Sequence, residues 1–306
     1  MTAIGLGKII LLGEHAVVYG FPALAAALDR GVTIAAVPTP AGGSLRIDIP
    51  AWSLKVTATD DHPVARSLLA IVDSLGLGRP TVSLVGDAQI PPGAGLGSSA
   101  ALAVAVSRAL LTHAKRKLDA REINVAASAS EALMHGKPSG VDVALAIAGG
   151  IGVFRKTTGL RSFASPSLRV LVGPSGAPRT TSAMVERVAE ATESSADDPR
   201  LRALGALTDT GTTALLAKDL VGLGAAMNRA HGLLSELGVS TEQLDSLCEA
   251  ARVSGAYGAK LTGAGGGGAV IAIAPREREQ AVLTEWKNVG VTGFVATVGG
   301  GAGTAA

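Results

Sequence analysis

A glycine-rich segment that runs into two serines is the first feature of this sequence with the residues for chemistry. It reads IPPGAGLGSSAALAVA at residues 90–105. Glycines at 93, 95 and 97 allow the backbone to approach a ligand that side chains would exclude. A helix that starts at about Ser98 would direct its unpaired N–H groups and the positive end of its dipole at the same point. The segment therefore predicts an anion site, and phosphate is the anion that such loops recurrently bind.

The loop differs from two common phosphate-binding motifs. The Walker motif requires Lys directly after its last Gly, where this chain has Ser98. The dinucleotide fingerprint GxGxxG would require Gly at 98, and Pro91 and Pro92 precede the loop in place of an open strand. The alternative interpretation is a helix N-cap with a flexible lead-in. Three alternating glycines beside two serines favour the phosphate loop.

Other charged residues stand in apolar surroundings. Lys8 precedes an apolar run that ends in Gly13-Glu14-His15, and residues at that place either cap a strand at the surface or line a site. Glu131 lies in the small, apolar stretch AASASEALM, and Asp142 precedes VALAIA. A carboxylate entering such a run is costly unless it is paired or coordinates a ligand. The alternative for Asp142 is a solvent-exposed helix start.

Together these groups predict phosphoryl transfer. Phosphoryl transfer from a nucleotide uses a glycine loop that binds the phosphates, and a hydroxyl and a carboxylate that hold Mg²⁺. It also uses a Lys that stabilises the charge developing on the transferred group, and an Asp that accepts a hydroxyl proton. A second glycine-rich stretch, KLTGAGGGGAVIAI at 260–273, offers another flexible backbone surface before a strand. Its alternative is a tight turn at a domain interface, which would not need four consecutive glycines.

Composition excludes several other classes of protein. With 27 basic and 25 acidic residues, the net charge of +2 gives no field that would predict a nucleic-acid or membrane partner. The compact basic run at 115–117 is expected to end a helix, where cations suit the dipole. A single cysteine, Cys248, excludes an internal disulfide framework and a cysteine-rich metal site, and it fits a reducing cytosol.

The apolar segments predict a soluble, cytoplasmic protein. The N-terminal segment lacks the apolar core and cleavage site of a signal peptide. Stretches such as 141–154 and 263–274 are interrupted by glycine and are shorter than the ~20 residues of a bilayer span. The length of 306 residues suffices for two domains. The best linker candidate is 155–167, which would also suit a hairpin turn beside a domain boundary.

The elements that must position the site alternate between strand and helix patterns. Turn residues and apolar runs predict strands at 7–12, 32–37, 45–49, 53–58, 81–85, 150–155, 168–172, 268–274 and 293–298. Periodicity and capping residues predict helices at 62–76, 98–118, 121–135, 181–194, 199–216, 219–237 and 240–254. The polar segment 193–200 is expected to be a loop between helices, and the tail after residue 298 to be loose.

Five segments resemble the mevalonate kinase family within the GHMP kinase superfamily. They occur in the family order and are spread over nearly the whole chain. They are GKIILLGEHAVVYG (7–20), PPGAGLGSSAA (91–101), EALMHGKPSGVD (131–142), PRTTSAMV (178–185) and KLTGAGGGGAV (260–270).

The resemblance implies a role for each matching residue in the ATP-dependent phosphorylation of the C5 hydroxyl of mevalonate. Ser99 and Glu131 would hold Mg²⁺, and Lys8 and Asp142 would be the catalytic pair. The substrate-binding residues would be Glu14, His15 and Thr181. The loop that binds the ATP phosphates would comprise Gly93, Ala94, Gly95, Leu96, Gly97 and Ser98.

The resemblance also implies the fold class, an α+β, two-domain GHMP kinase fold. An N-terminal α/β domain with a left-handed βαβ unit, which binds ATP, is expected over 1–165. A C-terminal ferredoxin-like domain is expected over 166–306. The sequence is compatible with a homodimer.

Three positions depart from the commonest family pattern. Val143, Ser182 and Ala269 stand where Asn, a basic residue and Cys are frequent. None removes a chemical role. Two other functions fit parts of this sequence. A kinase of a related small alcohol is one, although galactokinases would show GEHxDY in place of GEHAVVYG. A sensor without catalysis is the other, and it would require the replacement of Lys8, Glu131 or Asp142, which are all present.

Overall fold

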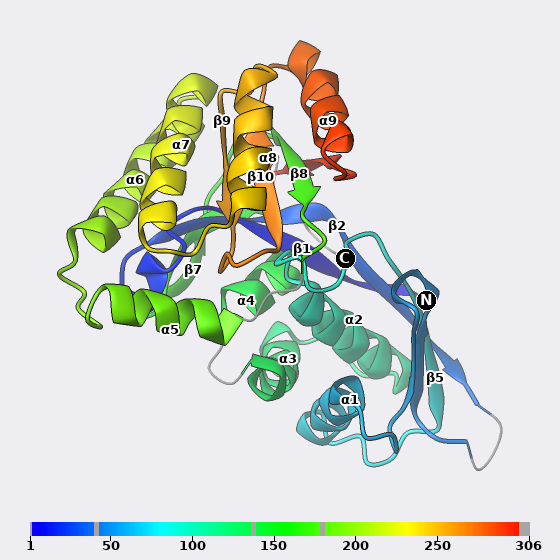
Figure 1. Ribbon diagram of the computed structural model, residues 1–306. Coiled ribbons are helices and arrows are strands. Elements are labelled where there is room, and N and C mark those ends of the chain that lie inside the picture. The colour runs from blue at the N-terminus through cyan, green and yellow to red at the C-terminus, as the bar shows by residue number, and fades with distance from the viewer. Residues whose placement is uncertain (1, 40–42, 136–138, 178–180, 300–306) are drawn as a thin grey trace. The chain divides into compact units, whose positions relative to one another are not determined.

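The computed structural model describes residues 2–39, 43–135, 139–177 and 181–299. Its contacts divide the chain into two compact units, each built from several segments (Figure 1). Unit one comprises 1–7, 30–92 and 97–148, and unit two comprises 8–29, 93–96 and 149–306. The strands β1 (Thr2–Leu12) and β2 (Ala23–Pro38) contribute residues to both units. The single boundary expected after residue 165 stays a prediction.

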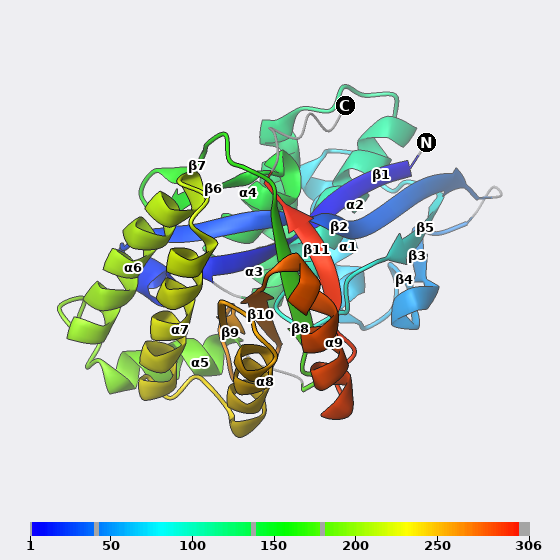
Figure 2. The same ribbon diagram turned by 90° about the horizontal axis from the view of Figure 1, so that it is seen from above.

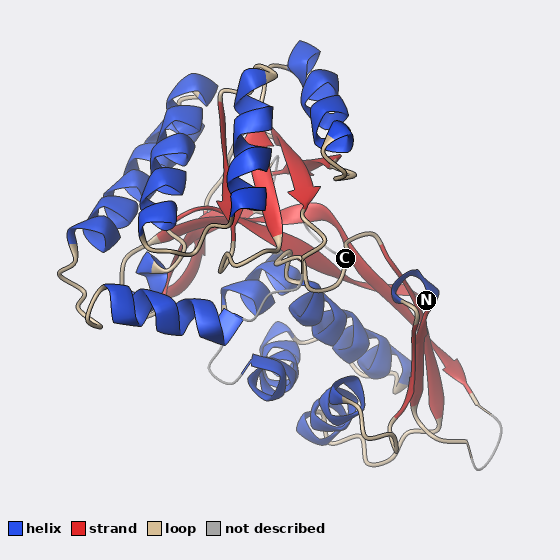
Figure 3. Ribbon diagram, in the orientation of Figure 1, coloured by secondary structure: helices blue, strands red, loops and turns tan. Residues whose placement is uncertain are grey.

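Unit one combines strands with a group of helices. β2 pairs antiparallel with β5 (Val82–Ala88), β5 pairs parallel with β3 (Arg46–Ile49), and β3 pairs antiparallel with β4 (Leu54–Thr57). The helix α1 packs on α3, and α3 packs on α2, as the helices coloured in Figure 3 illustrate. The helices and the short 3-10 helix of this unit are α1 (Pro63–Ser74), α2 (Ser98–His113), α3 (Ala120–His135), α4 (Val141–Ala148) and η2 (Pro50–Trp52).

The helix α2 begins at Ser98, as predicted, and its small side chains allow close packing. A Cβ added at Gly5 of β1 would lie 2.0 Å from the carbonyl oxygen of Ala101, so only glycine permits this approach. The helix ends at His113 and not at 118. Lys115 has a φ of 55°, which leaves the right-handed region and stops the helix. The basic run 115–117 therefore follows the helix, and the prediction that it ends the helix was wrong.

Unit two contains an antiparallel sheet with the strand order β11-β8-β10-β9 among its described residues (Figure 2). The chain passes from β8 through helices to the hairpin β9–β10, then through α9 to β11. This βαββαβ pattern with that order is the ferredoxin-like arrangement, as predicted. The strands are β8 (Leu168–Pro174), β9 (Gly258–Thr262), β10 (Ala269–Ile273) and β11 (Phe294–Val298).

The other elements of unit two include a hairpin and long helices. β6 (Ile151–Arg155) pairs with β2 and with β7 (Gly159–Ser162), so the linker candidate 155–167 begins as a hairpin turn. The segment 193–198 is the predicted loop before α6. The helices are α5 (Thr181–Ala191), α6 (Pro199–Leu216), α7 (Leu220–Glu236), α8 (Glu242–Val253) and α9 (Glu279–Asn288), with the 3-10 helices η1 (Ala16–Tyr19) and η3 (Arg276–Arg278).

Several elements escaped the sequence patterns for physical reasons. All five residues of β9 are buried, so it shows none of the alternation of a half-buried strand. Only glycine fits at 258, the first residue of β9, because a Cβ there would lie 2.1 Å from the carbonyl oxygen of Gly224. α4 and α9 are only 8 and 10 residues long, at or below the length at which periodicity separates helix from strand. No described helix has the length and the apolar composition needed to cross a membrane.

Candidate active site

The glycine loop has the backbone that its sequence predicts. Gly93, Gly95 and Gly97 have φ values of 71°, 78° and 71°, in the left-handed region that other residues adopt only under strain. The intervening Ala94 and Leu96 are buried and anchor the loop. A Cβ added at Gly93 would meet no heavy atom of the described residues within 4 Å. The loop therefore leaves open backbone beside Gly93.

The loop leads directly into the N-terminus of α2. Gly97 is the N-cap residue, its carbonyl accepts a hydrogen bond from the Ala101 amide, and no described side chain caps the first turn. The first turn also contains no acidic residue. The unpaired amides and the helix dipole are thus available to an anion. Ser98 and Ser99, the first two residues of the helix, are half-buried.

The two residues predicted to hold Mg²⁺ both approach His135. The Ser99 hydroxyl lies 3.0 Å from the Nε2 of His135, and a Glu131 carboxylate oxygen lies 3.9 Å from the same nitrogen. Glu131 is 2% exposed, one helical turn before His135 on α3. The structure therefore brings Ser99 and Glu131 to one place within unit one. His135 was not among the predicted site residues, although its i,i+4 spacing from Glu131 was a usable signal.

The predicted catalytic residues belong to different units. Lys8 lies in β1, in the part that belongs to unit two, and it is 3% exposed. Burial excludes the alternative that it caps a strand at the surface. Asp142 is the second residue of α4 in unit one and is half-buried, where the helix dipole favours a carboxylate. The Lys8 amide donates a 2.8 Å hydrogen bond to the carbonyl of Leu96 in the glycine loop. The Lys8–Asp142 pair itself stays a prediction.

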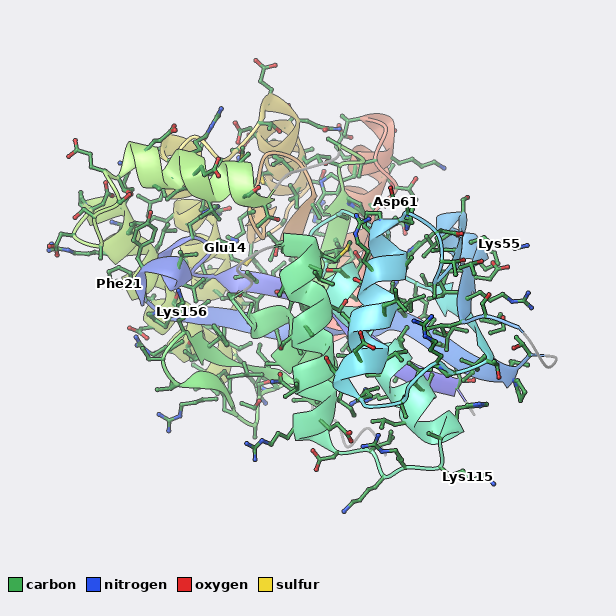
Figure 4. The ribbon with its side chains drawn as sticks, turned by 90° about the horizontal axis from the view of Figure 1, so that it is seen from below. Glu14, Phe21, Lys55, Asp61, Lys115 and Lys156 are labelled. Carbon is green, nitrogen blue, oxygen red and sulfur yellow. The ribbon has the colours of Figure 1, made fainter. Side chains whose placement is uncertain are left out.

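Glu14 and His15 form a buried turn after β1, and Glu14 is labelled in Figure 4. The Nζ of Lys260 donates a short hydrogen bond to Oε1 of Glu14, and both side chains are almost completely inaccessible. The ring Nε2 of His15 lies 2.9 Å from the carbonyl oxygen of Ala264, and His15 has a φ of 60°. Such strain at a non-glycine residue is typical of functional sites. Lys260 lies in the glycine-rich segment 260–273, and no role was predicted for it.

Burial dominates the electrostatics of this ion pair. Desolvation raises the pKa of Glu14 above its usual value, and the Lys260 and Lys8 charges act in the opposite direction. Desolvation likewise lowers the pKa of Lys260, against the attraction of Glu14.

The remaining substrate residue lies at the start of a helix. Thr181 begins α5 and is half-buried. The three residues before it in the PRTT segment, 178–180, lie outside the described residues, as do 136–138 of the HGKPSGVD segment.

The two halves of the chain match two known domain families. The family described as GHMP kinases N terminal domain matches residues 63–150, and GHMP kinases C terminal matches residues 212–292. The mevalonate kinase of Thermococcus sibiricus is 36% identical, and the match covers 92% of this chain and 91% of the relative. This chain belongs to the mevalonate kinase family of the GHMP kinases. The Pyrococcus horikoshii mevalonate kinase is 37% identical over 90% of this chain and 89% of its own.

Solved structures of the mevalonate kinase family share the fold. The L. major mevalonate kinase, solved in complex with R-mevalonate, is 27% identical with a TM-score of 0.87, and the match covers 99% of this chain and 97% of that one. The Methanococcus jannaschii mevalonate kinase is 25% identical with a TM-score of 0.85, covering 98% of both chains. The two-domain GHMP kinase fold predicted from the sequence is thereby confirmed.

Proposed function

We propose that this protein transfers the γ-phosphoryl group of ATP to the C5 hydroxyl of mevalonate, producing 5-phosphomevalonate in the mevalonate pathway of isoprenoid biosynthesis. The observation that carries the proposal is the loop of three left-handed glycines that opens into the uncapped N-terminus of α2. That geometry supports a kinase because it suits polyphosphate. The mevalonate kinases among its relatives, similar over nine-tenths of the chain, support mevalonate as the acceptor.

ATP would lie with its phosphates on the loop 93–98, within the N-terminal domain expected over 1–165. The residues present fit Mg²⁺, because Ser99 and the buried Glu131 offer the oxygen ligands that this ion prefers. No cluster of three or more His, Cys, Asp or Glu able to hold a metal occurs within the described residues. Phosphate oxygens and water would therefore complete the coordination, as is usual for Mg²⁺ beside a nucleotide. The bound ion would neutralise charge on the phosphates.

Lys8 and Asp142 would act on the reacting groups. Asp142 would accept the proton of the C5 hydroxyl, and Lys8 would stabilise charge on the transferring phosphoryl group. Glu14, His15 and Thr181 would bind mevalonate. The buried turn of Glu14 and His15 supports this role, since polar groups held in a dry site give orientation and specificity. We place the enzyme in the cytoplasm.

A coupled assay tests the proposal. The purified protein is supplied with ATP and Mg²⁺ and, in turn, with mevalonate, galactose, homoserine or phosphomevalonate. We expect turnover with mevalonate to exceed turnover with each other acceptor by at least about tenfold in kcat/KM, a difference of about 1.4 kcal/mol. A higher kcat/KM for another alcohol would assign the protein to a related small-molecule kinase. If no acceptor is phosphorylated while ATP binding is intact, the result would support the alternative function, a sensor without catalysis. Light scattering of the same sample distinguishes a monomer from a homodimer.

A further inference from the structure

The start of the glycine-rich segment 260–264 is attached by side chains to β1 and to the Glu14-His15 turn. Lys260 donates to Glu14, and the carbonyl of Ala264 lies 2.9 Å from the His15 ring. Between them, the Thr262 hydroxyl accepts from the Ile10 amide at 2.9 Å and donates to the Ile10 carbonyl at 3.0 Å. All these residues belong to unit two and are buried. Alternate residues of one segment thus support the predicted substrate turn.

Among these contacts, the ion pair of Lys260 carries the largest desolvation cost. It is 0% exposed on β9, and its Nζ donates to Glu14 and to the carbonyl of Leu261. Removing two charges from water carries a large desolvation penalty for each ion, and a buried pair adds little net stability compared with apolar residues of similar volume. Stability alone therefore does not account for a charged pair at this position.

The two carboxylate oxygens of Glu14 differ in their surroundings. Oε1 accepts the Lys260 hydrogen bond, whereas Oε2 is buried and has no hydrogen-bond partner among the described residues. A buried, unsatisfied oxygen destabilises the folded protein, and more so if it is charged, so its presence calls for an explanation. A hydroxyl donor from a ligand would satisfy it.

We propose that Lys260 is a positioning residue, which fixes Glu14 as an ionised carboxylate through Oε1 and leaves Oε2 to accept a hydrogen bond from a hydroxyl of the acceptor substrate. This inference rests on the proposed function, because the substrate is the alcohol that the kinase phosphorylates. The Lys8 charge also favours the ionised form of Glu14, so the carboxylate is influenced both by the positioning lysine and by the predicted catalytic lysine. Lys260 would then act on substrate binding without touching the substrate.

A double-mutant cycle tests the coupling, with Glu14→Gln, Lys260→Met, the double variant and the wild type. The Gln side chain keeps a carbonyl for the Lys260 ammonium, and the double variant leaves no uncompensated buried charge. We expect Lys260→Met to lower kcat/KM for the acceptor at least about tenfold, mainly through KM, with ATP binding unchanged. In the Glu14→Gln background, Lys260→Met should lower kcat/KM for the acceptor by less than about threefold. Lys156→Met on the exposed β6–β7 turn is the matched control.

The pH dependence gives a readout that a purely structural role would not change. Removal of Lys260 removes an attraction that lowers the pKa of Glu14, so that pKa rises further above its usual value. In Lys260→Met the acceptor KM should therefore be most elevated at low pH and should recover as the pH rises and Glu14 ionises. Lys260→Arg keeps a cation and should restore part of kcat/KM without the added pH dependence.

Three outcomes would overturn the inference. They are equal effects of Lys260→Met in both backgrounds, an effect on ATP binding alone, and a pH-independent loss that Lys260→Arg does not relieve. If Lys260→Met does not fold, Lys260→Arg and a comparison of the double variant with Glu14→Gln decide the question. The cycle is measured with whichever alcohol the wild type phosphorylates best. Failure of mevalonate as a substrate thus contradicts the proposed function, and additivity contradicts only the role of Lys260.

Discussion

The hydroxyl of Ser99, in the first turn of α2, lies 3.0 Å from the Nε2 of His135 at the end of α3. The Glu131 carboxylate approaches the same nitrogen within 3.9 Å. One imidazole thus connects the N-terminus that follows the glycine loop with a carboxylate from a separate helix. The hydroxyl and the carboxylate that a nucleotide-bound Mg²⁺ would use are therefore assembled by the packing of α2 against α3.

Replacement of Glu131 by Gln should raise the Mg²⁺ concentration needed for half-maximal activity. The substitution removes the one carboxylate proposed to bind the ion, and Mg²⁺ is held by few protein ligands, so each contributes strongly. We expect an increase of about tenfold or more, equivalent to about 1.4 kcal/mol, measured by Mg²⁺ titration at saturating ATP. Glu190→Gln on the exposed face of α5 is the control. An unchanged Mg²⁺ requirement would remove Glu131 from the metal site.

A methyl group at Gly93 should weaken ATP binding. Gly93→Ala places a Cβ in space that the described residues leave open beside the loop, where the phosphates would lie. Gly290→Ala is a matched control, because Gly290 also has a positive φ, 84° against 71°, and equally open surroundings. Both variants should lose similar stability from backbone strain. Calorimetry should show at least about tenfold weaker ATP binding for Gly93→Ala alone. Equal ATP affinity in both would mean that the loop is only a helix cap.

Conversion of Asp142 to Asn should abolish most turnover while leaving ATP binding nearly intact. Asn keeps the shape but cannot accept the hydroxyl proton, so kcat should fall by about 10²–10⁴. Lys8→Met should also lower kcat, and the double variant should be much less than multiplicatively worse, since coupled catalytic residues are not additive. Asp209→Asn, on an exposed turn of α6, is the control. If Asp142→Asn retains more than about a tenth of wild-type kcat, Asp142 positions the substrate and is not the base.

The stability of the protein should depend on pH through His231 of α7. Its Nε2 lies 3.0 Å from a carboxylate oxygen of Asp245, yet burial lowers the pKa of His231 to about 4. The Lys260 and Arg252 charges act in the same direction as burial, and Asp245 opposes it. Between pH 6.5 and 4 the unfolded chain therefore binds a proton that the folded chain does not. The free energy of unfolding should fall as the pH decreases through this range.

A comparison of variants isolates this contribution. From pH 7 to pH 5 the wild type should lose about 2 kcal/mol more stability than His231→Gln, as measured by urea unfolding at each pH. His113→Gln, which changes an exposed histidine at the end of α2, should keep the wild-type dependence. An identical pH dependence of the wild type and His231→Gln would show that His231 carries its proton in the folded state as readily as in the unfolded one.

The sequence alone was sufficient for features set by local backbone physics. Alternating glycines before two serines predicted both the left-handed loop and the start of α2 at Ser98, since only glycine adopts those φ values without strain. Motif order and spacing predicted the family, and the resemblance implied the ferredoxin-like sheet that unit two contains. Burial of Lys8, Glu14 and Glu131 was consistent with the apolar residues around them.

Only the tertiary structure decided which distant groups meet. Lys260 and Glu14 are separated by 246 residues, and neither local propensity nor periodicity encodes a hydrogen bond between them. His135 becomes a neighbour of Ser99, and His231 a neighbour of Asp245, because helices pack through faces that the sequence shows only as apolar or polar. Pairing and burial then shift the pKa values of Glu14, Lys260 and His231. The chemistry of the individual residues was thus readable from the sequence, whereas their partners and protonation depended on the packing of segments far apart in the chain.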